Sequence, residues 1–366
     1  MLLTQDRGGP ADLAVSVAQE LAARTGGPQI IIVGPVPVSS AGRPQSHLHQ
    51  AHVRSKRDLR GFRAVSKLLE DIAPDIIHAQ DRRAGLVASL AAGARKPVVL
   101  TFHGVPDSAA GRWVQAGPLR GRHPGLAGGS RLVADALVAR RVACTVAPSR
   151  AIAAFLQREL RVPARRLRVL HNGVAIPPDR QHRHTVRTFA TVSSFAPCKA
   201  TPALVEAFLA AAVKHADLRL LMVGDGPDRR ECEELVARSG RPRQVEFTGY
   251  RTDVAAQLGQ ADAFVLPSLN ENLPLALLQA MAMGLPCIAA DVGGIPEALD
   301  VSCGILVPPG DISALTAAME QLIRAPGLGD TLGGAARTRV AELFPLSRCA
   351  DQHLDLWQDI LDERRG

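Results

Sequence analysis

Residues 261–294, ADAFVLPSLNENLPLALLQAMAMGLPCIAADVGG, indicate the fold class because they hold a complete strand–helix–strand unit. The apolar run AFVLPS predicts one buried strand, and PCIAAD predicts the next. Between them, Pro274 begins a helical run that Gly284 ends. Strands that alternate with helices in this way build a parallel sheet.

The same alternation fills the chain in two series, separated by the polar stretch Pro177–Arg187. The first series holds IIIVG, PDIIHAQ, PVVLTFHG, CTVAPS and RLRVLHNGV, and the second holds FATVSS, LRLLMVGDG, VEFTGY, AFVLPS, PCIAAD and GILVPPG. A chain of 366 residues is long enough for two cores. We therefore predict an α/β protein with two Rossmann-like, doubly wound domains, residues 1–178 and 179–345, facing each other across a cleft.

Charge is distributed unevenly between these halves, although the net charge is only +8. Residues 1–178 carry 25 Lys and Arg against 11 Asp and Glu, a net of +14, and the remainder carries 18 against 24, a net of −6. A basic surface of this kind attracts phosphate groups, anionic lipid or nucleic acid. Biased arginine usage on a solvated surface explains the excess equally well, since only 5 of the 43 basic residues are Lys.

Several classes of protein are disfavoured by composition. No apolar run is long enough to span a membrane, and the N-terminus MLLTQDRGGP lacks the apolar stretch of a signal peptide, so we expect a cytoplasmic protein. The six cysteines are scattered without a C-x-x-C pair, which predicts reduced thiols and no metal site. Aromatic residues make up 3% of the chain, too few for the stacking surfaces of a nucleic-acid-binding protein.

Two features of the first half are weak candidates for a site. A predicted strand MLLTQ leads into Gly8, Gly9 and Pro10, where free N–H groups at a helix start favour an anion. A purely structural strand-to-helix turn would have the same sequence. His103 ends the run PVVLTFHG and could bind a ligand hydroxyl, although a lone histidine is more often structural. The glycine-rich residues 105–130 are predicted to form a loop.

The second half carries the stronger candidate. Glu271 lies just before the helix that Pro274 begins, where backbone N–H groups and the helix dipole can hold a diphosphate. Gln279 follows two helical turns later, on a related face. A carboxylate in this place could also do no more than complement the helix dipole.

The segment Pro267–Glu297 resembles the signature region of retaining glycosyltransferase family 4, whose members have the GT-B fold. The resemblance extends over almost the whole chain and includes GGP near the start, His103-Gly104, VAPSRA, HNGV, VGDGP and ADAFVLPS. The last helix, within residues 346–366, resembles the family's C-terminal helix, which packs back on the first domain. The resemblance implies a GT-B architecture with the acceptor in the N-terminal domain and the nucleotide-sugar in the C-terminal domain.

The resemblance also assigns roles, with two departures. In the family, a Glu reaches the donor's hexose and a second Glu, eight positions later, binds the ribose. Here Glu271 keeps the first position and Gln279 replaces the second. An Arg and a Lys usually neutralise the diphosphate, and this chain has Ser194 and Lys199 there. The Gln279 departure predicts weaker donor binding. The Ser194 departure predicts either that another arginine substitutes or that catalysis is weak.

The implied reaction transfers a hexose-type sugar from a nucleoside diphosphate to an acceptor hydroxyl, with retention and without a metal or other cofactor. Glu271 and His103 would contact the sugar. The remaining donor-binding positions implied are Gly8, Gly9, Ser194, Lys199, Gly249, Tyr250, Asn272, Leu273, Leu275 and Gln279.

The expected partners are a nucleoside-diphosphate sugar and a glycan or lipid-linked acceptor, as in cell-surface polysaccharide or lipopolysaccharide synthesis. The basic first half suggests peripheral contact with an anionic membrane, and no nucleic-acid partner is expected. Two alternatives stay open: a catalytically weak or silent nucleotide-sugar-binding protein of the same fold, and an epimerase that converts a nucleotide sugar without an acceptor.

Overall fold

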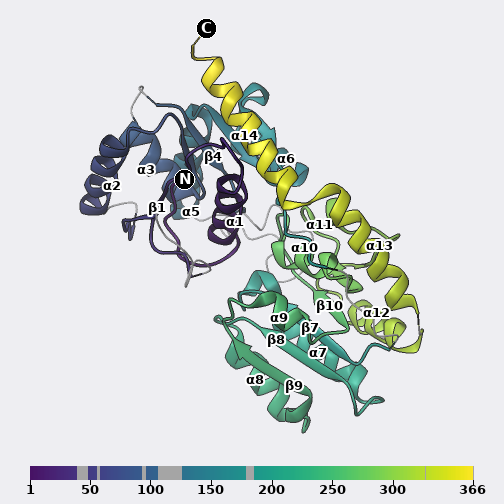
Figure 1. The fold of residues 1–366 in the computed structure, drawn as a ribbon. Helices are drawn as coiled ribbons and strands as arrows, with labels where there is room; N and C mark the ends of the chain where they lie inside the picture. The colour runs from purple at the N-terminus through teal and green to yellow at the C-terminus, as the bar shows by residue number, and fades with distance from the viewer. Residues whose placement is uncertain are drawn as a thin grey trace. The chain divides into compact units, whose positions relative to one another are not determined.

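The chain folds into two compact units in a computed structural model that describes residues 1–38, 48–55, 58–92, 96–105, 126–178, 185–325 and 327–365 (Figure 1). Unit 1 holds the described residues up to 105, those from 126 to 173 and those from 346 on. Unit 2 holds those from 174 to 345. The sequence placed this division near residue 178.

Unit 1 contains a short-stranded parallel sheet and its helices. The strands are β1 (Ile32–Gly34), β2 (Leu48–Gln50), β3 (Ile77–Ala79), β4 (Val98–Thr101), β5 (Cys144–Ala147) and β6 (Leu167–Val169). The helices are α1 (Gly9–Ala22), α2 (Leu59–Ile72), α3 (Arg82–Ala92), α5 (Leu126–Arg141), α6 (Arg150–Arg158), the 3₁₀ turn η2 (Ala164–Arg166) and α14 (Leu346–Asp362).

The predicted first strand MLLTQ is wrong in extent. Only Leu2 pairs, through parallel bridges to Val33 of β1 and Ala79 of β3. Leu2 therefore joins the pair β1–β2 to the series β3–β4–β5–β6. The chain turns away soon afterwards, because the Thr4 backbone N–H and hydroxyl donate to the Asp81 carboxylate at 2.9 and 2.7 Å.

The C-terminal helix α14 is part of unit 1, although it is the last element of the chain. It packs against α1, as the yellow and dark purple helices show (Figure 1). An ion pair between Arg24 and Asp351, 2.5 Å from Nη1 to Oδ1, links the end of α1 to α14. The buried side chains of α14, among them Leu356, Trp357 and Ile360, cover apolar surface of unit 1.

Unit 2 contains a six-stranded parallel sheet in the order β12-β11-β10-β7-β8-β9. Its strands are β7 (Thr188–Val192), β8 (Arg219–Val223), β9 (Val245–Gly249), β10 (Ala263–Leu266), β11 (Cys287–Ala290) and β12 (Ile305–Val307). The helices are η3 (Pro197–Lys199), α7 (Thr201–Ala212), α8 (Arg229–Arg238), η4 (Pro242–Gln244), α9 (Val254–Leu258), α10 (Leu275–Ala282), α11 (Ile295–Ala298), α12 (Ile312–Arg324) and α13 (Leu328–Leu343).

Both faces of this sheet are buried, which explains why its strands are apolar without interruption. Phe264 and Leu266 of β10 pack in a core with α10, α11 and α13. Ala263 and Val265 of the same strand pack in a second core with α7, α8 and α12. The helices therefore lie on both faces, and the predicted doubly wound arrangement is confirmed for this unit.

One further prediction concerns the segment that leads into α5. The predicted loop 105–130 is wrong for residues 126–130, which begin α5, and residues 106–125 lie outside the described part. The two passages of the chain between the units run side by side, because Val174 N–H donates to Phe344 O at 3.0 Å and Val174 forms a parallel bridge with Pro345.

Candidate functional site

The carboxyl edge of the unit 2 sheet collects the strongest candidate residues. β10 lies between β7 and β11, and all three run parallel, so the segments that follow them meet at one edge. The segment after β7 carries Ser194 and Lys199. The segment after β10 carries Ser268 and Glu271.

Glu271 is held by two side chains that converge on one of its oxygens. Lys199 Nζ lies 2.6 Å from Glu271 Oε1, and Ser268 Oγ donates a 2.8 Å hydrogen bond to the same oxygen. The Glu271 side chain is 6% exposed and that of Lys199 is 22% exposed. Glu271 Oε2 has no hydrogen-bond or ion-pair partner among the described residues. One carboxylate oxygen is thus committed to the protein and the other is available to a ligand.

The turn that carries Lys199 is fastened to the segment that carries Glu271. Leu269 N–H donates to Cys198 O at 2.8 Å, and the Leu269 side chain packs on Cys198 and Ala200. Ala200 adopts a left-handed backbone conformation at φ +50°, which brings the chain from η3 into α7. The separation of the two charged side chains is therefore fixed by backbone contacts as well as by their own attraction.

Gly293 fixes the backbone on the other side of Glu271. Its φ is +56°, and a Cβ there would lie 1.8 Å from Glu271 O. Only glycine allows so close an approach of two backbone segments in this conformation. The carbonyl of Glu271 is consequently packed against the segment that follows β11.

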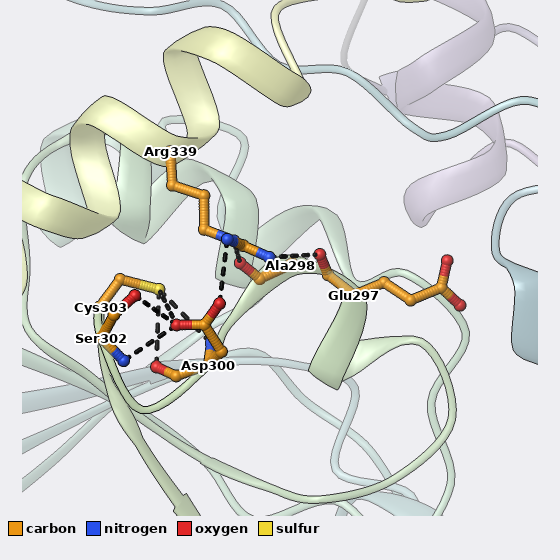
Figure 2. Close-up of polar contacts among 6 residues, drawn as sticks. All are labelled: Glu297, Ala298, Asp300, Ser302, Cys303 and Arg339. Carbon is orange, nitrogen blue, oxygen red and sulfur yellow. Dashed lines mark hydrogen bonds and ion pairs between the residues drawn. The ribbon is translucent and has the colours of Figure 1, made fainter.

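Figure 2 shows how that segment is anchored on α13. The Arg339 guanidinium donates to Ala298 O at 2.7 Å and to Glu297 O at 3.2 Å, and it pairs with Asp300 at 2.9 Å. Hydrogen bonds from the Ser302 side chain and backbone lower the pKa of Asp300. The carboxylate of Glu297 extends away from Arg339 (Figure 2). The guanidinium therefore binds the main chain of α11, leaving this carboxylate outside the cluster.

Ser194 is exposed, and its neighbours explain why the segment lies where it does. Phe195 is fully buried, and its N–H donates to Asp225 O at 2.9 Å. A Cβ on Gly224 would lie 1.8 Å from Ser193 O. Gly224 of the VGDGP motif thus permits two strand ends to pack closely. This packing explains the presence of a glycine here without any ligand.

The end of β9 brings an arginine beside the residues expected to bind the base. Gly249 has φ +71°, and a Cβ there would lie 3.7 Å from Arg229 Nη1. Tyr250 is 40% exposed. The Arg229 guanidinium lies 5.9 Å from the Phe247 ring centroid and pairs with Asp225 and Glu233. Arg229 follows β8, and β8 lies next to β7, the strand that precedes Ser194.

The start of α10 has the geometry expected from the sequence. Pro274 is the N-cap and Leu275 the first helical residue, so the first N–H groups of the helix have no acceptor within it. Leu273 is 1% exposed, which leaves its backbone rather than its side chain to meet a ligand. Asn272 and Gln279 are half-buried.

His103 belongs to unit 1, so the structure does not bring it together with Glu271 within one unit. It follows β4, and its Nε2 lies 3.1 Å from Oε1 of the buried Gln80. Burial lowers the pKa of His103 to about 3, with a smaller contribution from His353. The ring is therefore neutral at pH 7. Gly8, at φ +90°, precedes the first residue of α1, which is Gly9.

Two more histidines, His78 and His353, belong to a buried network beside His103. Trp357 Nε1–H donates to His78 Nδ1 at 3.2 Å, and His78 Nε2 lies 2.7 Å from Thr101 Oγ1. Because Trp is only a donor, His78 must be neutral with its proton on Nε2. His353 donates from Nδ1 to Cys349 O at 2.8 Å and stacks on His78. Burial lowers the pKa of both rings.

The sequence did not single out several residues that shape these sites. Ser268, Gln80, Gly293 and Arg339 were not predicted. A serine three positions before Glu271 is a signal for a local side-chain contact, and could have been found. The roles of Gly293 and Arg339 depend on segments distant in sequence, which no spacing rule reveals.

No helix in the described part of the chain is long and apolar enough to cross a membrane. Within the same residues, no group of three or more His, Cys, Asp or Glu is placed to hold a metal ion.

Comparison with known families covers both units. Residues 7–176 match a family model described as Glycosyltransferase Family 4. Residues 186–325 match one described as Glycosyl transferases group 1.

Individual relatives match over part of their length. The chain is 35% identical to N-acetyl-alpha-D-glucosaminyl L-malate synthase of Bacillus anthracis, over 48% of this chain and 46% of that protein. It is 32% identical to the lipopolysaccharide core biosynthesis glycosyltransferase LpsD of Rhizobium meliloti, over 40% of this chain and 43% of that protein. The chain thus spans somewhat less than half the length of these curated relatives.

A solved structure extends the likeness in fold to the whole chain. The Anabaena HepE protein in complex with UDP-glucose superposes with a TM-score of 0.80 and 18% identity, covering 98% of each chain.

Proposed function

The chain belongs to the family 4, group 1 glycosyltransferases, and on that premise we propose that it transfers a hexose-type sugar from a nucleoside diphosphate to an acceptor hydroxyl with retention. The observation that carries this proposal is the arrangement around Glu271. A buried carboxylate keeps one oxygen uncommitted, beside a cation and a helix N-terminus at the carboxyl edge of a parallel sheet.

The reaction breaks the bond between the anomeric carbon and the diphosphate oxygen and forms a bond to the acceptor oxygen, whose hydroxyl proton passes to the departing diphosphate. The electron pair of the broken bond stays on the diphosphate, so positive charge beside it lowers the barrier. Lys199 and the first N–H groups of α10 are the groups that would supply it, without a metal. Glu271 Oε2 would accept a hydrogen bond from a hexose hydroxyl.

We place the remaining donor contacts as the family resemblance implies. Gln279 would bind the ribose as an amide, and Gly249 and Tyr250 would lie near the base. His103 would contact the sugar from unit 1, and the Gly8–Gly9 turn would approach the phosphates.

Arg229 is our candidate for the cation that Ser194 does not provide. Its guanidinium lies beside Gly249, and its carboxylate partners Asp225 and Glu233 are about half exposed, so a phosphate can compete with them. Arg229→Ala should weaken binding of UDP by about tenfold, because the variant lacks one charge-assisted hydrogen bond to the diphosphate. Arg230→Ala is the matched control, because its side chain is 88% exposed and points to Glu234. Equal effects of the two variants would contradict this role.

The acceptor we propose is a glycan or lipid-linked glycan of cell-surface polysaccharide or lipopolysaccharide synthesis, the process named for the Rhizobium relative. A cytoplasmic protein that reaches such an acceptor would dock on the inner membrane face. Unit 1 offers suitable chemistry on α2, where Leu59, Arg60, Arg63 and Lys67 are exposed. Flotation with anionic vesicles at low salt tests this, and the absence of co-migration would contradict it.

The test of the activity itself is a panel of nucleotide sugars offered with and without a lipid-linked core acceptor. Transfer of sugar to the acceptor, with the anomeric configuration kept, is the expected result, and addition of EDTA should leave it unchanged. Binding of a nucleotide sugar without transfer or hydrolysis would instead identify a silent binding protein. Conversion of the donor without acceptor would identify an epimerase.

A further inference from the structure

We propose that Ser268 is a positioning residue that turns the carboxylate of Glu271 so that Oε2, and not Oε1, faces the donor's sugar. This inference rests on the proposed function, because it assigns a role to a residue that would not itself touch the donor. Ser268 is fully buried at the end of β10, and its hydroxyl donates to Oε1 at 2.8 Å.

The two groups on Oε1 differ in how firmly they are held. The Lys199 ammonium lies at the end of a flexible side chain that is 22% exposed, and an incoming diphosphate attracts it. Ser268 is 0% exposed and has a short side chain with one rotatable carbon–carbon bond. When Lys199 is shared with the diphosphate, Ser268 is the group that still restrains Oε1.

The backbone around Glu271 leaves the side chain as the only adjustable part. Gly293 packs against the Glu271 carbonyl, and Leu269 N–H is bonded to Cys198 O. A carboxylate on a fixed backbone can still rotate about its own side-chain bonds. The hydrogen bond from Ser268 selects one of these orientations, and that orientation determines which oxygen meets the sugar.

The experiment compares binding of UDP and UDP-glucose by calorimetry, with GDP and GDP-mannose as a second pair. Wild-type protein should bind one nucleotide sugar more tightly than its nucleoside diphosphate, and this ratio measures the contact with the sugar. Ser268→Ala should reduce the ratio at least fivefold and leave binding of the diphosphate alone within twofold. An unchanged ratio would overturn the positioning role, whereas wild-type protein that binds none of the four probes would overturn the proposed function.

A double-mutant cycle separates positioning from general damage to the fold. In a Glu271→Gln background, Ser268→Ala should have no further effect on the ratio, because it acts only through the carboxylate. An equal effect in both backgrounds would contradict the proposal. Thr191→Val is the control, since it removes from β7 a buried hydroxyl that has no hydrogen-bond partner among the described residues, and it should leave the binding of both ligands unaffected.

A ligand-free crystal structure of Ser268→Ala gives a readout that needs no donor. The Glu271 carboxylate should rotate from its wild-type position or become disordered, while its backbone stays in place. A carboxylate that keeps its position without the hydroxyl would show that Lys199 alone is sufficient.

Discussion

The histidine network of unit 1 and the Lys199–Glu271 pair of unit 2 are both buried and polar. They differ in how many of their polar atoms have hydrogen-bond partners. In the network, His78 has a partner on each ring nitrogen, and its tautomer follows from the donor on Trp357. Around Glu271, two donors crowd one oxygen and the other has no partner among the described residues. A saturated network stabilises a fold, whereas a buried carboxylate with an open acceptor oxygen can still accept a hydrogen bond from a ligand.

Glu271→Ala removes the buried carboxylate of the Lys199–Glu271 pair. Loss of the sugar contact should reduce kcat/KM by about 100- to 1,000-fold, the size of effect seen when one preorganised group is removed. Folding should persist, because Lys199 is partly exposed and can be hydrated. Transfer assays and circular dichroism check both points, and unchanged turnover would show that Glu271 is no part of the site.

Gly293→Ala tests whether the backbone beside Glu271 is as fixed as its contacts indicate. The substitution places a Cβ 1.8 Å from Glu271 O at a φ of +56°. We expect a loss of about 2–4 kcal/mol in the free energy of unfolding, together with reduced activity. The matched control is Gly334→Ala within α13, where the new Cβ would meet no atom of the described residues within 4 Å beyond its chain neighbours and its own helix backbone. That variant should gain about 0.5–1 kcal/mol. Equal destabilisation by the two would contradict the close approach.

Acid should loosen the histidine network before it affects the rest of unit 1. Burial lowers the pKa of His78 and His353 below the ordinary value of 6.5, and that of His103 to about 3. Below pH 6.5 the unfolded chain therefore binds more protons than the folded chain, and stability falls as pH falls. Each ring contributes up to about 1.4 kcal/mol per pH unit, and the fall for His103 continues to about pH 3.

Urea denaturation followed by tryptophan fluorescence at pH 7, 6 and 5 measures this slope. His353→Gln should make the slope shallower. A free energy of unfolding that is constant over this range would show that the rings bind protons equally in the folded and the unfolded chain, which would contradict the lowered pKa values.

Trp357→Phe gives the smallest expected effect and tests the saturation of the network directly. The substitution keeps an aromatic ring, although a smaller one, and His78 Nδ1 loses its donor inside the core. We expect a loss of about 1–3 kcal/mol in stability with no change in the relative binding of UDP and UDP-glucose. A change in that relative binding would connect the network to the donor site and remove the distinction between the two regions.

The sequence predicted the family and the parallel α/β fold, and both are confirmed. Apolar runs and the residues that begin and end helices, such as Pro274 and Gly284, are local signals, so the unit 2 strands could be found directly. The prediction of a strand over MLLTQ was wrong because pairing stops after Leu2. The backbone N–H of Thr4 instead donates to the Asp81 carboxylate. That contact joins residues far apart in sequence.

The candidate site was predictable only in part, for a related physical reason. Glu271 and Lys199 were identified from a family pattern, but nothing in the sequence showed that they form an ion pair. Their proximity depends on the neighbouring placement of β7 and β10. The roles of Gln279, Ser194 and the remaining donor-binding positions stay predictions.

Because α14 completes unit 1 from the far end of the chain, the order of synthesis differs from the order of the architecture. The strands and helices up to residue 173 leave the ribosome without the indole that satisfies His78 and without the helix that packs on α1. The sheet of unit 2 is complete in the nascent chain before α14 is made. The packing of unit 1 therefore cannot be complete until residues 346–362 have been made.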